Sequence, residues 1–269
     1  MPKNEKITIM AQGQKKMYTI FIIAIFILFV LTTWYTEFNP LTLIENSDAF
    51  VTFITEDFFP PALPQEGKLA GIFSSVVVTL ALAMSSTTIA AILAFFVALF
   101  GSEKVSPFPK FAKVVRGFAT FLRNIPALVW AFILFSSLGI GMGVGFVALL
   151  ISSFAFMVRA FVETMEDVSQ DCVESLAAVG ATFPERVAQA ILPSCINGFL
   201  SWFLYCVEVN IRASTIVGMV GGGGVGLTLF SYIKGFKYDI AFSIILLIAV
   251  MVIVVDRITA VLRNEINKS

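Results

Sequence analysis

Residues 174–193 decide what kind of protein this chain forms, and they read ESLAAVGATFPERVAQAILP. The stretch predicts two short helices with a break at Gly180, because glycine adopts the backbone conformations that end a helix. Thr182 and Glu185 have the spacing of a capping box, and Pro184 falls in the first turn of the second helix, where proline is tolerated. Small residues before Gly180 would let the first helix lie close against another surface.

The composition around this stretch is that of a membrane protein. Hydrophobic residues make up 58% of the 269-residue chain and charged residues 13%, with a mean hydropathy of +0.92, whereas a soluble domain is about 25% charged. The 18 Lys and Arg balance the 18 Asp and Glu, so no nucleic-acid partner is indicated. Histidine is absent, which excludes His-dependent catalysis and imidazole metal sites. We therefore expect no catalytic, cofactor or metal site, and we interpret the three separated cysteines as packing residues.

Uncharged runs predict six membrane-spanning helices, each needing about 20 mostly apolar residues. The runs are residues 17–36, 69–102, 124–158, 187–207 and 240–255. Four glycines between positions 139 and 145 divide the third run into two spans. The last run is extended by a few residues on a tilted helix. The first span has no small-residue cleavage site after it, so we interpret it as an uncleaved anchor.

The cations predict that both termini are cytoplasmic, because loops on that side carry an excess of Lys and Arg. They cluster before the first span, between the second and third, around the fourth loop and after the last span; they are Lys3, Lys6, Lys15, Lys16, Lys104, Lys110, Lys113, Arg116, Arg159, Arg186, Arg257, Arg263 and Lys268. The predicted division is a cytoplasmic tail (1–17), a first span (18–35), an acidic extracytoplasmic segment (36–68), a core of five helices (69–262) and a second tail (263–269).

Within that core, residues 213–239 are interpreted as a glycine-rich outer loop that is partly re-entrant. Gly221 to Gly224 make this stretch a poor helix, and a seventh span here would move the C-terminal cations to the outside, against the charge rule. Gly221, Gly223 and Gly226 match a GxGxxG pattern, but no strand precedes them, so no dinucleotide site is indicated. The glycines Gly221, Gly222, Gly223 and Gly224, with Ser214 and Thr215, are candidates for a gate.

Two polar groups near the spans have alternative interpretations. Glu208 and Arg212 lie four residues apart on one helix face, and the sequence places them near the outer end of the fifth span. They either pair with each other and stiffen the helix end, or Arg212 and Asn210 face the translocation path and offer donors to an oxyanion. Arg123 and Pro126 mark the start of the third span, as an interfacial anchor or as a kink in the helix.

The loop between the fourth and fifth spans, residues 164–193, which we call the coupling segment, resembles the EAA signature of binding-protein-dependent ABC importer permeases. That signature is Glu-Ala-Ala, three residues, Gly, nine residues, Ile, one residue and Leu-Pro. Glu174, Gly180, Leu192 and Pro193 fall in register, while Ser175, Leu176 and Ala190 replace the two alanines and the isoleucine. The resemblance implies an all-α membrane protein with the six-helix, type I (MetI-like) permease fold. It also implies that Glu174, Ala177, Ala178, Gly180 and Ala181 form a coupling helix that docks on an ATP-hydrolysing subunit.

A second resemblance, covering residues 39–263, is to the phosphonate branch of these permeases. It rests on the stretch from Asn210 to Gly221, on residues 39–44 and 58–61, on residues 234–236 and on the tail from Asp256 to Arg263. It implies a multi-pass permease of the bacterial inner membrane that is not itself an enzyme. Its implied partners are a second copy, two subunits that bind ATP and magnesium, an extracytoplasmic solute-binding protein and a phosphonate. Phosphite, hypophosphite, phosphate, methionine or another small solute remain alternative substrates.

Overall fold

The computed structural model describes residues 12–39, 41–64, 66–168, 170–266 and 268. Lys3, Lys6 and most of the predicted N-terminal tail lie outside these residues. The chain divides into two compact units, residues 1–56 and 57–269. Both are helical wherever regular structure is described.

The first unit contains the predicted first span. Helix α1 (Gln12–Tyr35) includes a stretch from Lys15 to Tyr35 that is long and apolar enough to cross a membrane. Its sequence is apolar on every side, as a helix surrounded by lipid requires. The acidic segment that follows is helical too, as α2 (Leu41–Glu45), α3 (Ser47–Thr52) and the π-helix η1 (Phe53–Phe58), which reaches into the second unit.

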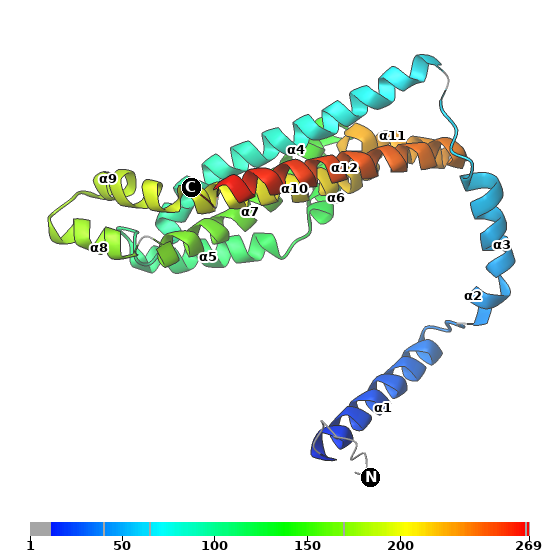
Figure 1. The fold of residues 1–269 in the computed structure, drawn as a ribbon, viewed down its shortest axis with the longest axis horizontal. Helices are drawn as coiled ribbons and strands as arrows, with labels where there is room; N and C mark the ends of the chain where they lie inside the picture. The colour runs from blue at the N-terminus through cyan, green and yellow to red at the C-terminus, as the bar shows by residue number, and fades with distance from the viewer. Residues whose placement is uncertain (1–11, 40, 65, 169, 267, 269) are drawn as a thin grey trace, which may run out of the picture. The chain divides into compact units, whose positions relative to one another are not determined.

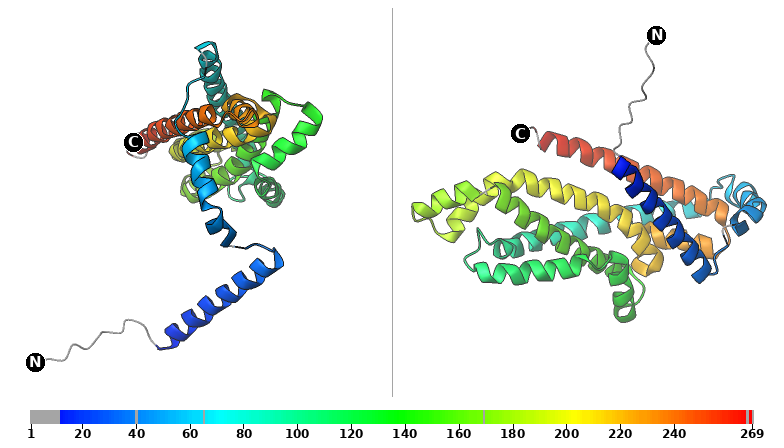
Figure 2. Two further views of the ribbon diagram at one scale, coloured as in Figure 1. Left: turned by 90° about the vertical axis from the view of Figure 1, so that its right-hand side faces the viewer. Right: turned by 90° about the horizontal axis from the view of Figure 1, so that it is seen from below.

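The second unit is a bundle of long helices that run side by side (Figures 1 and 2). The bundle consists of α4 (Glu66–Gly101), α7 (Met142–Val168), α10 (Leu192–Val217) and α12 (Tyr238–Ile266), with α5 (Pro109–Arg123) alongside. At one end lie α8 (Gln170–Ala178) and α9 (Phe183–Arg186), followed by the π-helix η2 (Val187–Ile191). Towards the other end lie the π-helix η3 (Gly218–Gly222) and α11 (Gly224–Lys234). The coupling segment and the glycine run are therefore separated by the length of the bundle.

Small side chains allow α4 to pack closely against α7 and α10. Ala90, Ala94 and Ala98 recur every four residues on α4 and are fully buried, in one cluster with Met157 of α7 and Phe199 of α10. Small residues at helix interfaces let backbones approach, which is how helices associate where lipid removes the hydrophobic driving force.

The part of the chain that the structure describes contains fewer unbroken spans than the six that the sequence predicts. Among the described residues, five helices are long and apolar enough to cross a membrane, and a sixth span exists if α5 and α6 (Ala127–Leu138) are counted as one bent pair. The two helices meet at 83°. With 12 residues, α6 is about 18 Å long, short of the ~30 Å hydrocarbon core. By length and composition the bent pair fits a broken span or a re-entrant loop, and its first half carries cations that the sequence analysis places between two spans.

The predicted outer loop at residues 213–239 is wrong for most of its length. Residues up to Val217 continue α10, and η3 and α11 follow with only Gly223 between them. Glycine has a poor helix propensity, but packing overrides it here, because the absence of side chains allows backbones to touch. A re-entrant arrangement remains compatible with α11, which has 11 residues and is too short to span.

Candidate functional site

The coupling segment has the two helices, the break and the cap that the sequence predicts. Gly180 has a positive φ of 84°, and the backbone amides of Gly180 and Ala181 donate to the carbonyl oxygens of Ala177 and Leu176, both at 3.0 Å. The backbone amide and the hydroxyl of Thr182 both donate to Glu185 Oε2 at 2.7 Å. These two hydrogen bonds, the hydroxyl's first, lower the pKa of the Glu185 carboxyl below its ordinary value. The capping box is confirmed.

This segment is anchored on one side and exposed on the other. Val173 is buried in the main core cluster, and Leu176, Phe183 and Val187 pack against it. The residues of the signature face outward instead: Glu174, Ala177, Ala178 and Gly180 are exposed and Ala181 is half-buried. Between them Val179 is 79% exposed. The arrangement presents a small, rigid apolar tip, as a surface that docks into a partner's groove would.

At the middle of the bundle, four charged side chains join α10 to α12. Arg212 forms an ion pair with Glu208 and lies 3.4 Å from an oxygen of Asp256, while Arg263 lies 3.5 Å from the other oxygen of Glu208. We call these four residues the outer cluster. The Arg212 and Asp256 side chains are 47% and 40% exposed. Two positive and two negative charges balance, so the cluster is neutral as a whole yet accessible.

The depth of the outer cluster corrects one prediction. Glu208 and Arg212 were expected near the outer end of a span, but α10 continues to Val217. Glu208 pairs with Arg263, which is close to the end of α12 that lies towards α8 and α9 (Figure 1). The charges therefore lie in the second half of α10 and the second half of α12. Ionisable groups within membrane helices are costly and usually face a cavity or each other, and here they face each other and remain partly open.

Asn210 is buried between three helices. It is 3% exposed, and its amide nitrogen donates to the hydroxyls of Thr87 on α4 (2.8 Å) and Ser153 on α7 (2.6 Å). We call Asn210, Thr87 and Ser153 the inner cluster. The expectation that Asn210 offers donors to a substrate is wrong, because a helix turns by about 100° per residue and so points residue 210 away from the face of residues 208 and 212.

The candidate gate residues are packed, not open. Ser214 is buried, Thr215 is half-buried, and both hydroxyls donate to the carbonyl oxygen of Ile211, at 2.8 and 3.5 Å. Gly221, Gly222 and Gly223 are also buried. These residues hold the end of α10 in place, and whether they move during transport stays a prediction.

Close backbone contacts explain the glycine run. A side chain on Gly145 of α7 would place its Cβ 2.4 Å from the carbonyl oxygen of Gly222, and one on Gly226 would be 1.9 Å from that of Thr215. The amide of Gly141 donates to the carbonyl oxygen of Gly221 at 2.8 Å. Gly221, Gly223 and Gly224 also have positive φ values, of 105°, 83° and 68°. The run therefore fastens η3 to the start of α7 and α11 to the end of α10.

Arg123 and Pro126 stand at the break in the third span. Arg123 is the last residue of α5, where a cation complements the helix dipole, and Pro126 precedes the first turn of α6. The predicted kink at Pro126 is confirmed by the 83° bend. Arg123 is exposed, as an interfacial anchor would be.

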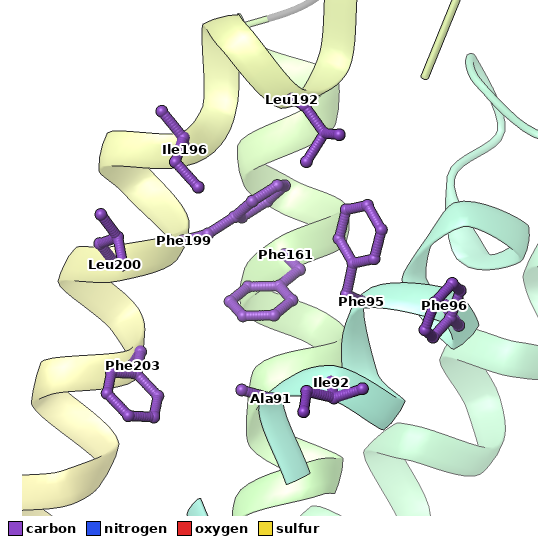
Figure 3. Close-up of a pocket in the computed structure, with 10 residues that line it drawn as sticks. All are labelled: Ala91, Ile92, Phe95, Phe96, Phe161, Leu192, Ile196, Phe199, Leu200 and Phe203. Carbon is purple, nitrogen blue, oxygen red and sulfur yellow. The ribbon is translucent and has the colours of Figure 1, made fainter. Parts of the chain in front are cut away.

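A groove of about 440 Å³ between α4 and α10, floored by α7, is a different kind of site (Figure 3). It is lined by Ala91, Ile92, Phe95, Phe96, Phe161, Leu192, Ile196, Phe199, Leu200 and Phe203. Every lining side chain is apolar, so the groove offers no donor to an anion.

Several residues of these sites were missed from the sequence. Thr87 and Ser153 lie in long apolar runs where a lone hydroxyl usually bonds its own helix, so only the partner on another helix reveals their role. Asp256 enters the sequence analysis only as the residue that bounds the last uncharged run and begins the last stretch of the phosphonate-branch resemblance, and its approach to Arg212 is visible only in the structure. The cysteine interpretation holds for the buried Cys195 and Cys206, while Cys172 is exposed and is not a packing residue.

Residues 90–268 match the family described as "Binding-protein-dependent transport system inner membrane component". The chain belongs to this family. It is therefore a multi-pass inner-membrane permease component of a bacterial importer that works with a binding protein, as the signature in the coupling segment predicted.

Two sequence relatives carry related names. The chain is 30% identical over 236 residues to "Phosphite transport system permease protein PtxC" of Stutzerimonas stutzeri, covering 88% of this chain and 85% of the relative. It is 27% identical over 235 residues to "Phosphate-import permease protein PhnE" of Mycolicibacterium smegmatis, covering 87% of this chain. It spans only 43% of the length of that second protein.

Solved structures confirm the fold class. The permease chain in "Inward facing conformations of the MetNI methionine ABC transporter" superposes with a TM-score of 0.67 at 18% identity, covering 76% of this chain and 99% of that one. A chain of a bacterial alginate ABC transporter superposes with a TM-score of 0.57 at 14% identity and covers 96% of this chain. At such identities the likeness establishes the MetI-like fold alone.

Proposed function

We propose that this permease imports phosphonates, or a closely related phosphorus oxyanion, in an ATP-driven transporter. The observation that carries the proposal is Arg212, a half-exposed guanidinium held between a carboxylate of α10 and a carboxylate of α12. A guanidinium forms bidentate hydrogen bonds with phosphonate and phosphate oxygens. The relatives named for phosphite and phosphate import support the same class of substrate.

The proposed assembly contains two copies of this chain, two ATP-binding subunits and a solute-binding protein. ATP and Mg²⁺ would be held by the partner subunits, and this chain supplies no phosphate-binding loop in its sequence. The exposed tip around Val179, flanked by Glu174 and Ala178, docks on the ATPase, and its movement when ATP binds changes the tilt of α7 and α10. The acidic segment of residues 36–68 receives the binding protein.

In this mechanism Arg212 exchanges partners. With no substrate, Glu208 and Asp256 neutralise it and reduce the cost of a charge at membrane depth. An arriving oxyanion competes with these carboxylates for the guanidinium, and in a symmetric dimer the residue occurs twice around one axis. Because the carboxylates remain nearby, the anion is not held too tightly to leave, as transport requires.

Reconstitution of the complete transporter tests the proposal. The chain, its ATPase subunit and its binding protein are placed in nanodiscs, and ATPase activity is measured with phosphonates, phosphite, hypophosphite, phosphate and methionine. Stimulation by a phosphorus oxyanion supports the proposal, and the strongest stimulant identifies the substrate. Stimulation by methionine alone, or an activity indifferent to all five, would refute the substrate assignment.

A further inference from the structure

A second group of charges lies where α4 and α7 end beside the first half of α5. The guanidinium of Arg116 on α5 forms an ion pair with Glu166 on α7, and its Nε donates to the carbonyl oxygen of Gly101 at the end of α4 (2.8 Å). The Arg116 and Glu166 side chains are 26% and 17% exposed. One arginine therefore contacts all three helices.

The Glu166 carboxylate also accepts hydrogen bonds from the turn that follows α4. Its Oε1 accepts hydrogen bonds from the backbone amide of Glu103 (2.9 Å) and the hydroxyl of Ser102 (3.2 Å). The ammonium group of Lys104 donates to the backbone oxygen of Glu166 at 3.3 Å. Hydrogen bonds to an ionised carboxylate are roughly twice as strong as neutral ones, so this single side chain fixes the turn after α4 and the position of α5.

The location of this group connects two sites already described. Two residues beyond Glu166, α7 ends at Val168, and the coupling helix α8 begins at Gln170. In the other direction, α5 leads through the bend to α6, and Ala131 of α6 is buried with Val217 at the end of α10. A displacement of the end of α7 is therefore transmitted to α5 and on to the broken span.

We infer that the Arg116–Glu166 pair is a joint that makes α4, α5 and α7 follow the coupling helix as one body. Both are positioning residues, since neither lies in the docking tip or in the outer cluster. Without the ion pair, α7 could move while α5 and α6 stay behind, and ATP would be hydrolysed with less transport. The inference rests on the proposed ATP-driven function.

The chain offers a matched control on the same helix. Arg159 and Glu163 form an ion pair at 2.8 Å with a spacing of four residues, both within α7. Glu163 is 55% exposed, and the pair joins no two helices. Removing its charge changes the same kind of interaction, three residues away, without loosening α5.

The experiment compares Glu166→Gln with Glu163→Gln in proteoliposomes that contain the ATPase subunit and the binding protein. Measured are substrate imported per ATP hydrolysed and the thermal midpoint of the purified complex. We expect about a tenfold fall in the import ratio for Glu166→Gln, equivalent to about 1.4 kcal/mol of coupling, and less than a twofold change for Glu163→Gln. Equal ratios in Glu166→Gln and the wild type would overturn the inference.

Two further variants guard against a purely structural effect. Arg116→Gln removes the cation from the other side of the pair, and we expect a similar fall in the ratio; a ratio equal to that of the wild type would contradict the joint. If Glu166→Gln does not fold, Arg116→Lys keeps the charge but loses the planar fork, and an undiminished ratio in it would likewise overturn the inference. A wild-type complex without ligand-stimulated ATPase would count against the proposed function instead.

Discussion

The inner and outer clusters of α10 lie at the same depth, two residues apart in sequence, and differ in almost every physical respect. Asn210 of the inner cluster is buried, and its amide nitrogen is satisfied by hydroxyls from two other helices. Arg212 of the outer cluster is half-exposed and shared between two carboxylates at unequal distances. A polar group with fixed short-range partners holds helices together, whereas a charge with exchangeable partners can accept a ligand. Depth in a membrane protein therefore does not by itself indicate function.

The largest effect is expected from a substitution that disturbs the packing of α10, because both clusters depend on that packing. Gly145→Ala would place a methyl group 2.4 Å from the carbonyl oxygen of Gly222, and neither backbone can yield without moving η3. We expect little or no folded protein, measured as the monodisperse fraction in detergent. Gly143→Ala is the control, because nothing lies within 4 Å of its Cβ. Equal yields of the two variants would show that the glycine contacts do not hold this end of the bundle.

The next effect concerns the outer cluster alone. Arg212→Ala removes a charged donor worth about 1.5–3 kcal/mol, so ligand-stimulated import should fall by roughly 10- to 100-fold. The import rate is measured in proteoliposomes, with Arg159→Ala on α7 as the control variant. Import at the wild-type rate in Arg212→Ala would refute a role for this side chain in translocation.

The inner cluster should respond in stability and not in transport. Asn210→Ala leaves the hydroxyls of Thr87 and Ser153 without their shared donor, at a cost of about 1–3 kcal/mol. We expect a lower thermal midpoint and a normal import rate per folded complex. A normal midpoint combined with lost import would reverse the roles assigned to the two clusters.

The smallest effect concerns the coupling segment. The pKa of Glu185 is lower in the folded chain than its ordinary value of 4.5, so the cap contributes stability above that value and loses it as the pH falls through the lowered folded-state pKa. Amide hydrogen exchange of residues 182–187 should therefore increase, after correction for intrinsic rates, only below about pH 4.5. Glu185→Gln should lose this dependence, and the same acid response in that variant would contradict the assignment.

Features that depend on neighbouring residues are predicted well from the sequence, whereas the surroundings of a side chain within the bundle are predicted poorly. The break at Gly180, the cap at Thr182 and the bend at Pro126 all depend on neighbouring residues, and all three are confirmed. The pairing of Glu208 with Arg212 follows from their spacing of four residues and is confirmed. The burial of Asn210 was missed, because uncharged runs show where a helix can cross but not which way each face points. The helical character of residues 213–234 was missed because glycine propensity does not reveal the close backbone contacts at Gly145 and Gly226.

Cysteine accessibility in the assembled transporter tests the distinction between the two clusters most directly. Arg212→Cys and Asn210→Cys are made in a chain whose exposed Cys172 is replaced by serine, and each is treated in nanodiscs with a charged, water-soluble thiol reagent. The account predicts rapid labelling at position 212, slowed by the transported oxyanion, and none at position 210. Labelling at position 210, or full protection at position 212 in every nucleotide state, would contradict it.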